Sequence, residues 1–145
     1  MQGWRAKNVE IQILQDMEYY FSATLKGSFE EAVSKVTEAL DSEGFGVITR
    51  IVMHEKLKEK LGVDFKKYVI LGACNPPLAY KALLAEDKIG TMLPCNVLVI
   101  DQGHDKIEVA AVNPVASMSA ISNPSLGGVA SDVTARLKRV IEKMA

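Results

Sequence analysis

Two cysteine–asparagine pairs carry the most specific chemistry in this sequence. Cys74-Asn75 ends one apolar segment, and Cys95-Asn96 begins another. If these segments form neighbouring strands, two thiols and two amides meet at one end of a sheet. Pockets at the ends of strands commonly hold small ligands. We therefore expect a ligand-binding site formed by Cys74, Asn75, Cys95 and Asn96.

The two thiols leave three kinds of function open. Twenty residues separate Cys74 from Cys95, which is neither a zinc-ligand spacing nor a Cys-x-x-Cys motif. The first interpretation is a small-molecule or metal-binding domain. The second is a thiol-dependent redox enzyme or sensor, because a cysteine just before a helix N-terminus is favoured as thiolate. The third is a structural dimerising module in which the cysteines are simply small buried residues.

The remaining polar residues point to no further site. Asn75 also fits a helix cap, with Pro76 at the first helical position, whereas Asn96 has no such structural role. His54 precedes a charged segment and His104 lies in a short turn, so both are expected at the solvated surface. The sequence identifies no catalytic residue and no cofactor.

Length and composition bound the class of protein. The 145 residues suit one domain, and a net charge of -1 gives no indication of nucleic-acid binding. The apolar runs are much shorter than the roughly 20 residues of a membrane helix. The first sixteen residues lack the apolar core of a signal peptide. We expect a cytoplasmic protein with reduced thiols.

Hydrophobic periodicity predicts an α+β fold: a mixed sheet of about five strands with three main helices packed on it. The element order is β-α-β-α-β-α-β-β-α. Strand 45–53 is nearly all apolar, so we expect it to be central or covered on both faces. Residues 88–93 are expected to form a loop. The predicted elements are strand 18–26, helix 28–44, strand 45–53, short helix 54–61, strand 67–73, helix 75–86, a hairpin of strands 96–101 and 106–112, and a helix from 123.

Residues 1–16 are interpreted as an N-terminal extension of a single domain that spans residues 17–145. Val9, Ile11 and Ile13 alternate as in a strand, while Asn8 equally fits the cap of a short helix. Met17 is an alternative start. The apolar residues of this segment require cover from the domain or from a partner subunit.

From Met17 onward the chain resembles the Domain of Unknown Function 302 family. The resemblance implies a compact α/β domain of bacteria and archaea and a homodimer, and it implies no established reaction. The family usually has Asp-Pro where this chain has Asn113-Pro114, and commonly an acidic residue near Arg50. The segments that carry the resemblance are Glu18-Tyr-Tyr, Ser28-Phe-Glu-Glu-Ala, Ala39-Leu, Glu43-Gly-Phe-Gly-Val, Ile70-Leu-Gly-Ala-Cys-Asn-Pro-Pro, Gly90, Leu93-Pro-Cys-Asn-Val and Asn113-Pro114.

Overall fold

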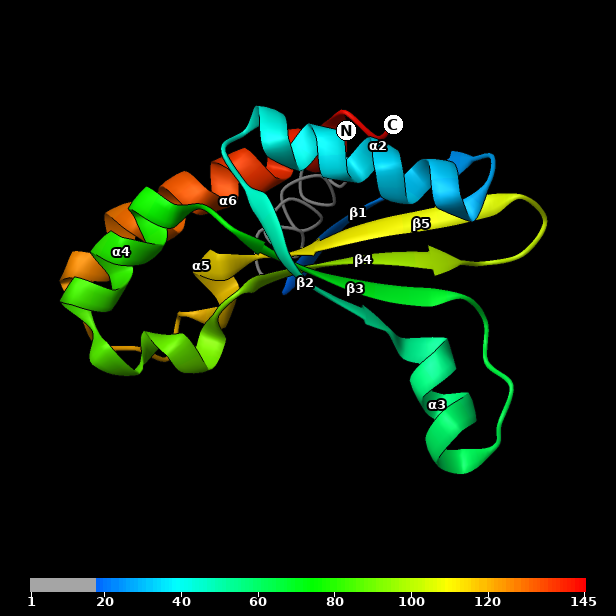
Figure 1. The fold of residues 1–145 in the computed structure, drawn as a ribbon. Helices are drawn as coiled ribbons and strands as arrows, with labels where there is room; N and C mark the ends of the chain where they lie inside the picture. Colours follow the sequence, from blue (N-terminus) through cyan, green and yellow to red (C-terminus); the bar gives the residue numbers. More distant parts are fainter. Residues whose placement is uncertain (1–17) are drawn as a thin grey trace, which may run out of the picture.

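The computed structural model describes residues 18–145, which are built on one five-stranded sheet (Figure 1). The strands lie in the order β1-β5-β4-β3-β2, and each neighbouring pair is antiparallel. The predicted α+β class and element order are confirmed, while the pairing is uniformly antiparallel where a mixed sheet was expected. The strands are β1 Tyr20–Lys26, β2 Gly46–Val52, β3 Tyr68–Cys74, β4 Cys95–Asp101 and β5 Lys106–Val112.

Three main helices pack with the sheet. In Figure 1, α2 and α6 lie side by side over one face, and α4 lies next to α6 beyond the end of the strands. The short helix α3 projects from the β2 edge towards the other side of the sheet. The helices are α2 Phe29–Ser42, α3 Met53–Leu61, α4 Pro76–Ala85, α5 Pro114–Ser117 and α6 Gly127–Glu142, with 3₁₀ turns η1 Asp87–Met92 and η2 Pro124–Leu126.

The hydrophobic core lies between the sheet and the pair α2 and α6. Every second residue of a strand points to the same face, so Leu71, Val97 and Val109 all enter the core and are at most 2% exposed. Leu40 of α2 and Leu137 of α6 meet them and are fully buried. Burying each such side chain contributes roughly 1.5–3 kcal/mol, so this layer fixes how the helices sit on the sheet.

The ends of α2 follow the local signals in the sequence. The Ser28 hydroxyl accepts a hydrogen bond from the Glu31 N–H at 3.1 Å, which satisfies one free donor of the first turn. Gly44 lies just beyond the other end at a φ of +87°, a conformation that glycine adopts without strain. The chain therefore leaves α2 at the predicted position and enters β2.

The prediction that strand 45–53 is central or covered on both faces is wrong, because β2 is an edge strand. Ile48 and Ile51 are 62% and 42% exposed. Ile51 pairs with Ile70 on the sheet face opposite to α2 and α6. No main helix of residues 18–145 crosses that face, so part of the apolar character of β2 is not explained by burial within this part of the chain (Figure 1).

Smaller differences from the predicted elements fall in the second half of the chain. The expected loop at 88–93 contains η1. Asn123 caps η2 by accepting the Ser125 N–H, and α6 begins only at Gly127. The predicted hairpin is confirmed: β4 and β5 join through a turn in which Gly103, His104 and Asp105 have positive φ.

Asn113 fixes the position at which β1 begins. Its N–H donates to the Tyr19 carbonyl oxygen at 2.8 Å, and its side-chain Nδ2 donates to the Glu18 carbonyl oxygen at 2.9 Å. The Oδ1 atom is buried and has no hydrogen-bond partner among residues 18–145. An aspartate would lack the Nδ2 donor, so the amide suits this contact better than a carboxylate.

The predictions for residues 1–16, including a strand or an Asn8-capped helix, lie outside the described residues. Among the helices from residue 18 onward, none has the length and apolar character needed to cross a membrane.

Candidate functional site

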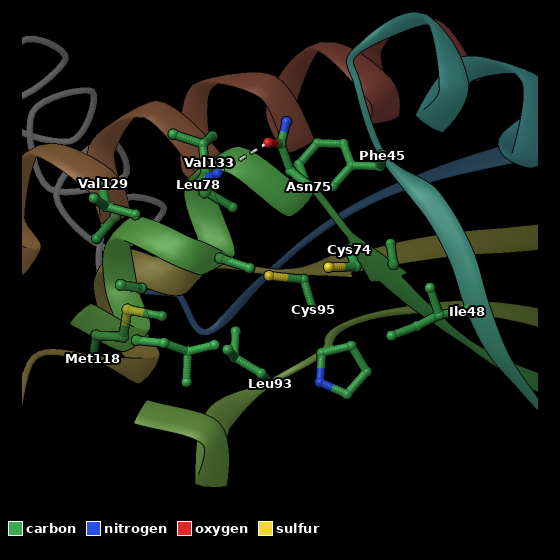
Figure 2. Close-up of a pocket in the computed structure, with 16 residues that line it drawn as sticks. Phe45, Ile48, Cys74, Asn75, Leu78, Leu93, Cys95, Met118, Val129 and Val133 are labelled. Carbon is green, nitrogen blue, oxygen red and sulfur yellow. Dashed lines mark hydrogen bonds between the residues drawn. The ribbon is translucent and has the colours of Figure 1, made fainter. Parts of the chain in front are cut away.

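A cavity of about 300 Å³ lies at the end of β3 and β4, between the sheet, α4 and α6 (Figure 2). Its wall is almost entirely apolar. Among the lining residues from position 18 onward, Asn75 is the only one whose side chain carries oxygen or nitrogen, and none is charged. The lining residues are Phe45, Ile48, Ala73, Cys74, Asn75, Leu78, Ala79, Ala82, Leu83, Leu93, Pro94, Cys95, Met118, Val129, Ala130 and Val133.

Both cysteines of the chain belong to this wall. Cys74 is the last residue of β3 and Cys95 the first of β4, and Ala73 pairs directly with Cys95. This register places the two cysteines diagonally across adjacent strands, and Figure 2 shows both side chains on the cavity wall with their sulfur atoms pointing in the same direction. Both are free thiols; Cys74 is half-buried and Cys95 is buried.

The surroundings of Cys95 keep its sulfur protonated. Burial raises the pKa of the Cys95 thiol from 9.0 to about 11, and the neighbouring Cys74 adds to the shift. Desolvation disfavours the thiolate, since a buried negative charge loses its hydration. At neutral pH Cys95 therefore behaves as a small apolar group with a weak donor.

Asn75 lies between the cavity and the start of α4. Its Oδ1 accepts the Leu78 N–H at 3.3 Å, so it caps α4, and the residue is only 8% exposed. A Cβ on Gly44 would lie 3.0 Å from the Asn75 Nδ2. The amide group of Asn75 is therefore held between the start of α4 and the turn after α2. Its Oδ1 has a structural role as the cap of α4.

The structure brings together three of the four predicted site residues. Cys74, Asn75 and Cys95 line one cavity, whereas Asn96 is exposed and points to the opposite face of the sheet. There Asn96 lines a separate depression with residues that include Thr91 and Ser117. Whether any of the four binds a ligand stays a prediction.

Sequence reasoning missed the greater part of the cavity wall. The predicted helix from residue 123 contains Val129, Ala130 and Val133, and the loop expected at residues 88–93 contains Leu93. Their apolar character and helical spacing are the same for a filled core and for a cavity wall. No signal in the sequence distinguishes the two.

The histidines differ from each other. His104 is exposed in the hairpin turn, as predicted. The prediction that His54 is a solvated surface residue is wrong, because it is half-buried and its Nδ1 accepts the Tyr68 N–H at 2.9 Å.

In residues 18–145, no group of three or more histidine, cysteine, aspartate or glutamate residues is arranged to hold a metal ion.

Comparison with known proteins identifies the family. The model of the Domain of unknown function DUF302 matches residues 21–144. The chain belongs to the DUF302 family. A crystal structure of the uncharacterized conserved protein DUF302 from Bacillus stearothermophilus is similar, with a TM-score of 0.80 and 29% sequence identity over 88% of this chain and 98% of that chain. No curated protein matches.

Membership in the DUF302 family supports the fold over nearly the whole described chain. It transfers no reaction, because the similar structure is itself of an uncharacterized protein. The function of this DUF302 domain must therefore be argued from its own cavity, surfaces and thiols.

Proposed function

We propose that this DUF302 domain binds a small, mainly apolar molecule in the cavity at the end of β3 and β4. The observation that carries the proposal is the cavity itself, about 300 Å³ with an apolar wall and no charged group. Well-packed cores leave few voids larger than a water molecule, so a space of this size requires an explanation. Its volume lies at the lower end of the range for ligand pockets.

The chemistry of the wall defines the ligand. Aliphatic side chains from α4 and α6 favour an apolar body, because transfer from water to such a wall is favourable in proportion to the area buried. Figure 2 shows Cys74 and Cys95 near the middle of the cavity wall, and Asn75 lines the wall at the start of α4. A ligand with one polar or sulfur-containing group fits this distribution. A metal ion fits less well, since the lining residues from position 18 onward offer only two thiols and one amide, and the amide oxygen already caps α4.

Filling the cavity tests the proposal. The neutral dye N-phenyl-1-naphthylamine serves as the apolar probe, with binding followed by fluorescence. Ala130 lines the cavity on α6 and Ala135 is exposed on the same helix, so Ala130→Leu removes space while Ala135→Leu is the matched control. We expect dye binding by the wild type and Ala135→Leu, and binding at least roughly tenfold weaker for Ala130→Leu, a loss of about 1.4 kcal/mol.

Overpacking can also destabilise a protein by about 1–3 kcal/mol, so the fold of each variant is checked by near-UV circular dichroism. Ala79→Leu provides a second test, since Ala79 lines the cavity but is only half-buried. The proposal fails if the wild type binds no dye, or if both cavity variants bind it as the wild type does. In that case the domain is better described as a structural module without a site.

A thiol redox role is the second candidate, favoured by the position of the two cysteines at the same end of adjacent strands. With hydrogen peroxide as oxidant, the Cys74 thiol would be oxidised to a sulfenic acid with release of water. Attack by the Cys95 thiol would then form a disulfide and release a second water. Resting thiols of this kind suit a reducing compartment such as the cytoplasm.

Intact-mass spectrometry after peroxide treatment tests this candidate. Disulfide formation removes two hydrogen atoms from the wild type, whereas Cys95→Ser should retain an added oxygen on Cys74. Absence of the disulfide in the wild type under conditions that oxidise glutathione would exclude the redox role.

We also propose that the domain forms a homodimer through the sheet face opposite to α2 and α6. The register aligns Ile51, Ile70 and Leu98 in one row across three strands on that face, where Ile51 is exposed and Ile70 and Leu98 are half-buried. The outer face of an antiparallel sheet is normally polar, and an apolar patch there commonly marks an interface. Two such faces stack at about 10 Å, with their apolar rows in contact.

Sedimentation velocity tests the dimer. Ile51→Lys places a charge in the row at a position already 42% exposed, so the fold should tolerate it. Leu84→Lys is the control, because Leu84 is 70% exposed on α4, away from this face. We expect a dimer for the wild type and Leu84→Lys, and a monomer for Ile51→Lys. A monomeric wild type would contradict the proposal.

A further inference from the structure

A second groove lies at the opposite end of β3 from the apolar cavity. It has a volume of about 420 Å³ and runs between α2, the β2–β3 edge and the start of α3. It shares no lining residue with the cavity. Its lining residues are Phe29, Glu30, Val33, Ser34, Arg50, Val52, His54, Glu55, Lys67 and Val69.

The groove combines an apolar floor with a charged rim. Val69 and Phe29 are 1% and 7% exposed, so they form a firmly packed base together with Val33 and Val52. The rim carries two cations and two carboxylates. This combination differs from the cavity at the other end of β3, which has no charge, and it indicates a different class of ligand.

Two of the four rim charges are already paired. Lys67 Nζ lies 3.3 Å from Glu30 Oε1 and 5.8 Å from the centre of the Phe29 ring. By contrast, Arg50 and Glu55 form no ion pair with any side chain of residues 18–145. Two opposite charges thus face one groove without neutralising each other. A molecule that carries both signs of charge can satisfy both.

His54 lies in the groove wall next to these charges. Its Nδ1 accepts the Tyr68 N–H at 2.9 Å. The ring packs edge-on against Phe29 with the centres 6.4 Å apart, which fixes its orientation. The backbone bond and this packing hold the imidazole in the wall of the groove.

We propose that this groove binds a small zwitterion, an α-amino acid with an apolar side chain. The guanidinium of Arg50 receives the carboxylate, a pairing that its planar fork of donors favours. The carboxylate of Glu55 receives the ammonium group, and the apolar side chain lies on Val33 and Val52, which are only partly buried. The groove volume falls within the usual range for small-molecule sites. This proposal is independent of the apolar ligand proposed for the cavity.

The test is a titration of ¹⁵N-labelled full-length protein with L-leucine, followed by amide chemical shifts. Two analogues isolate the charges: 4-methylpentanoate lacks the ammonium group and 3-methylbutylamine lacks the carboxylate. We expect leucine to shift the amides of Arg50, Glu55 and Val69. Each analogue should bind at least roughly tenfold more weakly, since each loses one charged hydrogen bond.

Variants assign the two charges. Arg50→Gln and Glu55→Gln should each weaken leucine binding by roughly tenfold or more. Glu59→Gln is the matched control on the same helix; Glu59 forms an exposed pair with Lys56 and does not line the groove. Unchanged amide shifts elsewhere establish that each variant is folded. The proposal is overturned if leucine causes no shift, if either analogue binds as well as leucine, or if both variants bind as the wild type does.

Discussion

The two thiols should differ sharply in their reactivity with iodoacetamide. Cys74→Ser leaves Cys95 as the single thiol, and burial, the larger cause of its raised pKa, remains in this variant. Only the thiolate reacts, so the alkylation rate reports the fraction ionised. We therefore expect the alkylation rate of Cys95 to depend on pH as its raised pKa dictates.

The expected difference in alkylation rate follows from the pKa of Cys95, which is about 11, compared with the ordinary thiol value of 9.0. At about pH 8, a thiol with the ordinary value is roughly 10% thiolate, whereas Cys95 would be roughly 0.1% thiolate. The more basic thiolate is a better nucleophile and recovers about tenfold of that hundredfold loss. Native Cys95 should therefore react about tenfold more slowly than an ordinary thiol on ionisation alone. Burial of its sulfur slows it further.

The assay measures pseudo-first-order alkylation of Cys74→Ser by mass spectrometry across the alkaline range. The same variant unfolded in urea is the control, because it contains the same thiol without burial. The native rate should keep rising beyond about pH 10, while the unfolded rate levels off near pH 9. A native rate that levels off near pH 9, or equals the unfolded rate at pH 8, would refute the argument from burial.

Three further predictions concern stability, each measured by urea denaturation. Between about pH 9 and pH 11, the wild type should lose roughly 2 kcal/mol more unfolding free energy than Cys95→Ala. The unfolded chain releases the Cys95 proton near pH 9.0, whereas the folded chain releases it only near pH 11. The stability contributed by the buried neutral thiol is thus complete below pH 9 and is lost as the pH rises. Asn75→Ala should cost about 1 kcal/mol through loss of the cap on α4, and Asn75→Ser should retain most of it; equal losses would contradict the capping role. Gly72→Ala should cost about 1–3 kcal/mol, because the new Cβ would collide with Thr49 Oγ1 and lie 2.7 Å from Pro94 Cγ; Thr49→Ala should recover only part of that loss, since Pro94 remains.

The parts of the fold that the sequence predicts well are those set by neighbouring residues. Ser28 and Gly44 bound α2 because a cap and a positive φ depend on a few adjacent positions. Asn75 and Pro76 mark the start of α4 for the same reason. The hairpin between β4 and β5 is likewise a local structure, formed by two apolar runs around a glycine-containing turn.

The position of a strand within the sheet is not a local property. The apolar residues of β2 suggested a central strand, but Ile48 and Ile51 are exposed at an edge. The apolar character of a residue indicates that its burial is favourable. It does not indicate which element, or which copy of the chain, buries it. The same limit applies to the cavity, since Val129 and Val133 would show the same spacing in a filled core.

The separation of Asn96 from the other predicted site residues has a simple geometric cause. Consecutive residues of a strand point to opposite faces, so Cys95 and Asn96 at the start of β4 lie on different faces of the sheet, and only Cys95 lines the cavity. This alternation between faces does not apply to Cys74 and Asn75, because β3 ends at Cys74 and the chain turns into α4 after Asn75. Two identical Cys-Asn pairs thus have different geometry, and any shared chemistry rests on the thiols rather than on the amides. A site defined by Cys74 and Cys95 should therefore lose its ligand when either thiol is replaced by a bulkier residue, while Asn96→Ala should leave binding of the apolar dye unchanged.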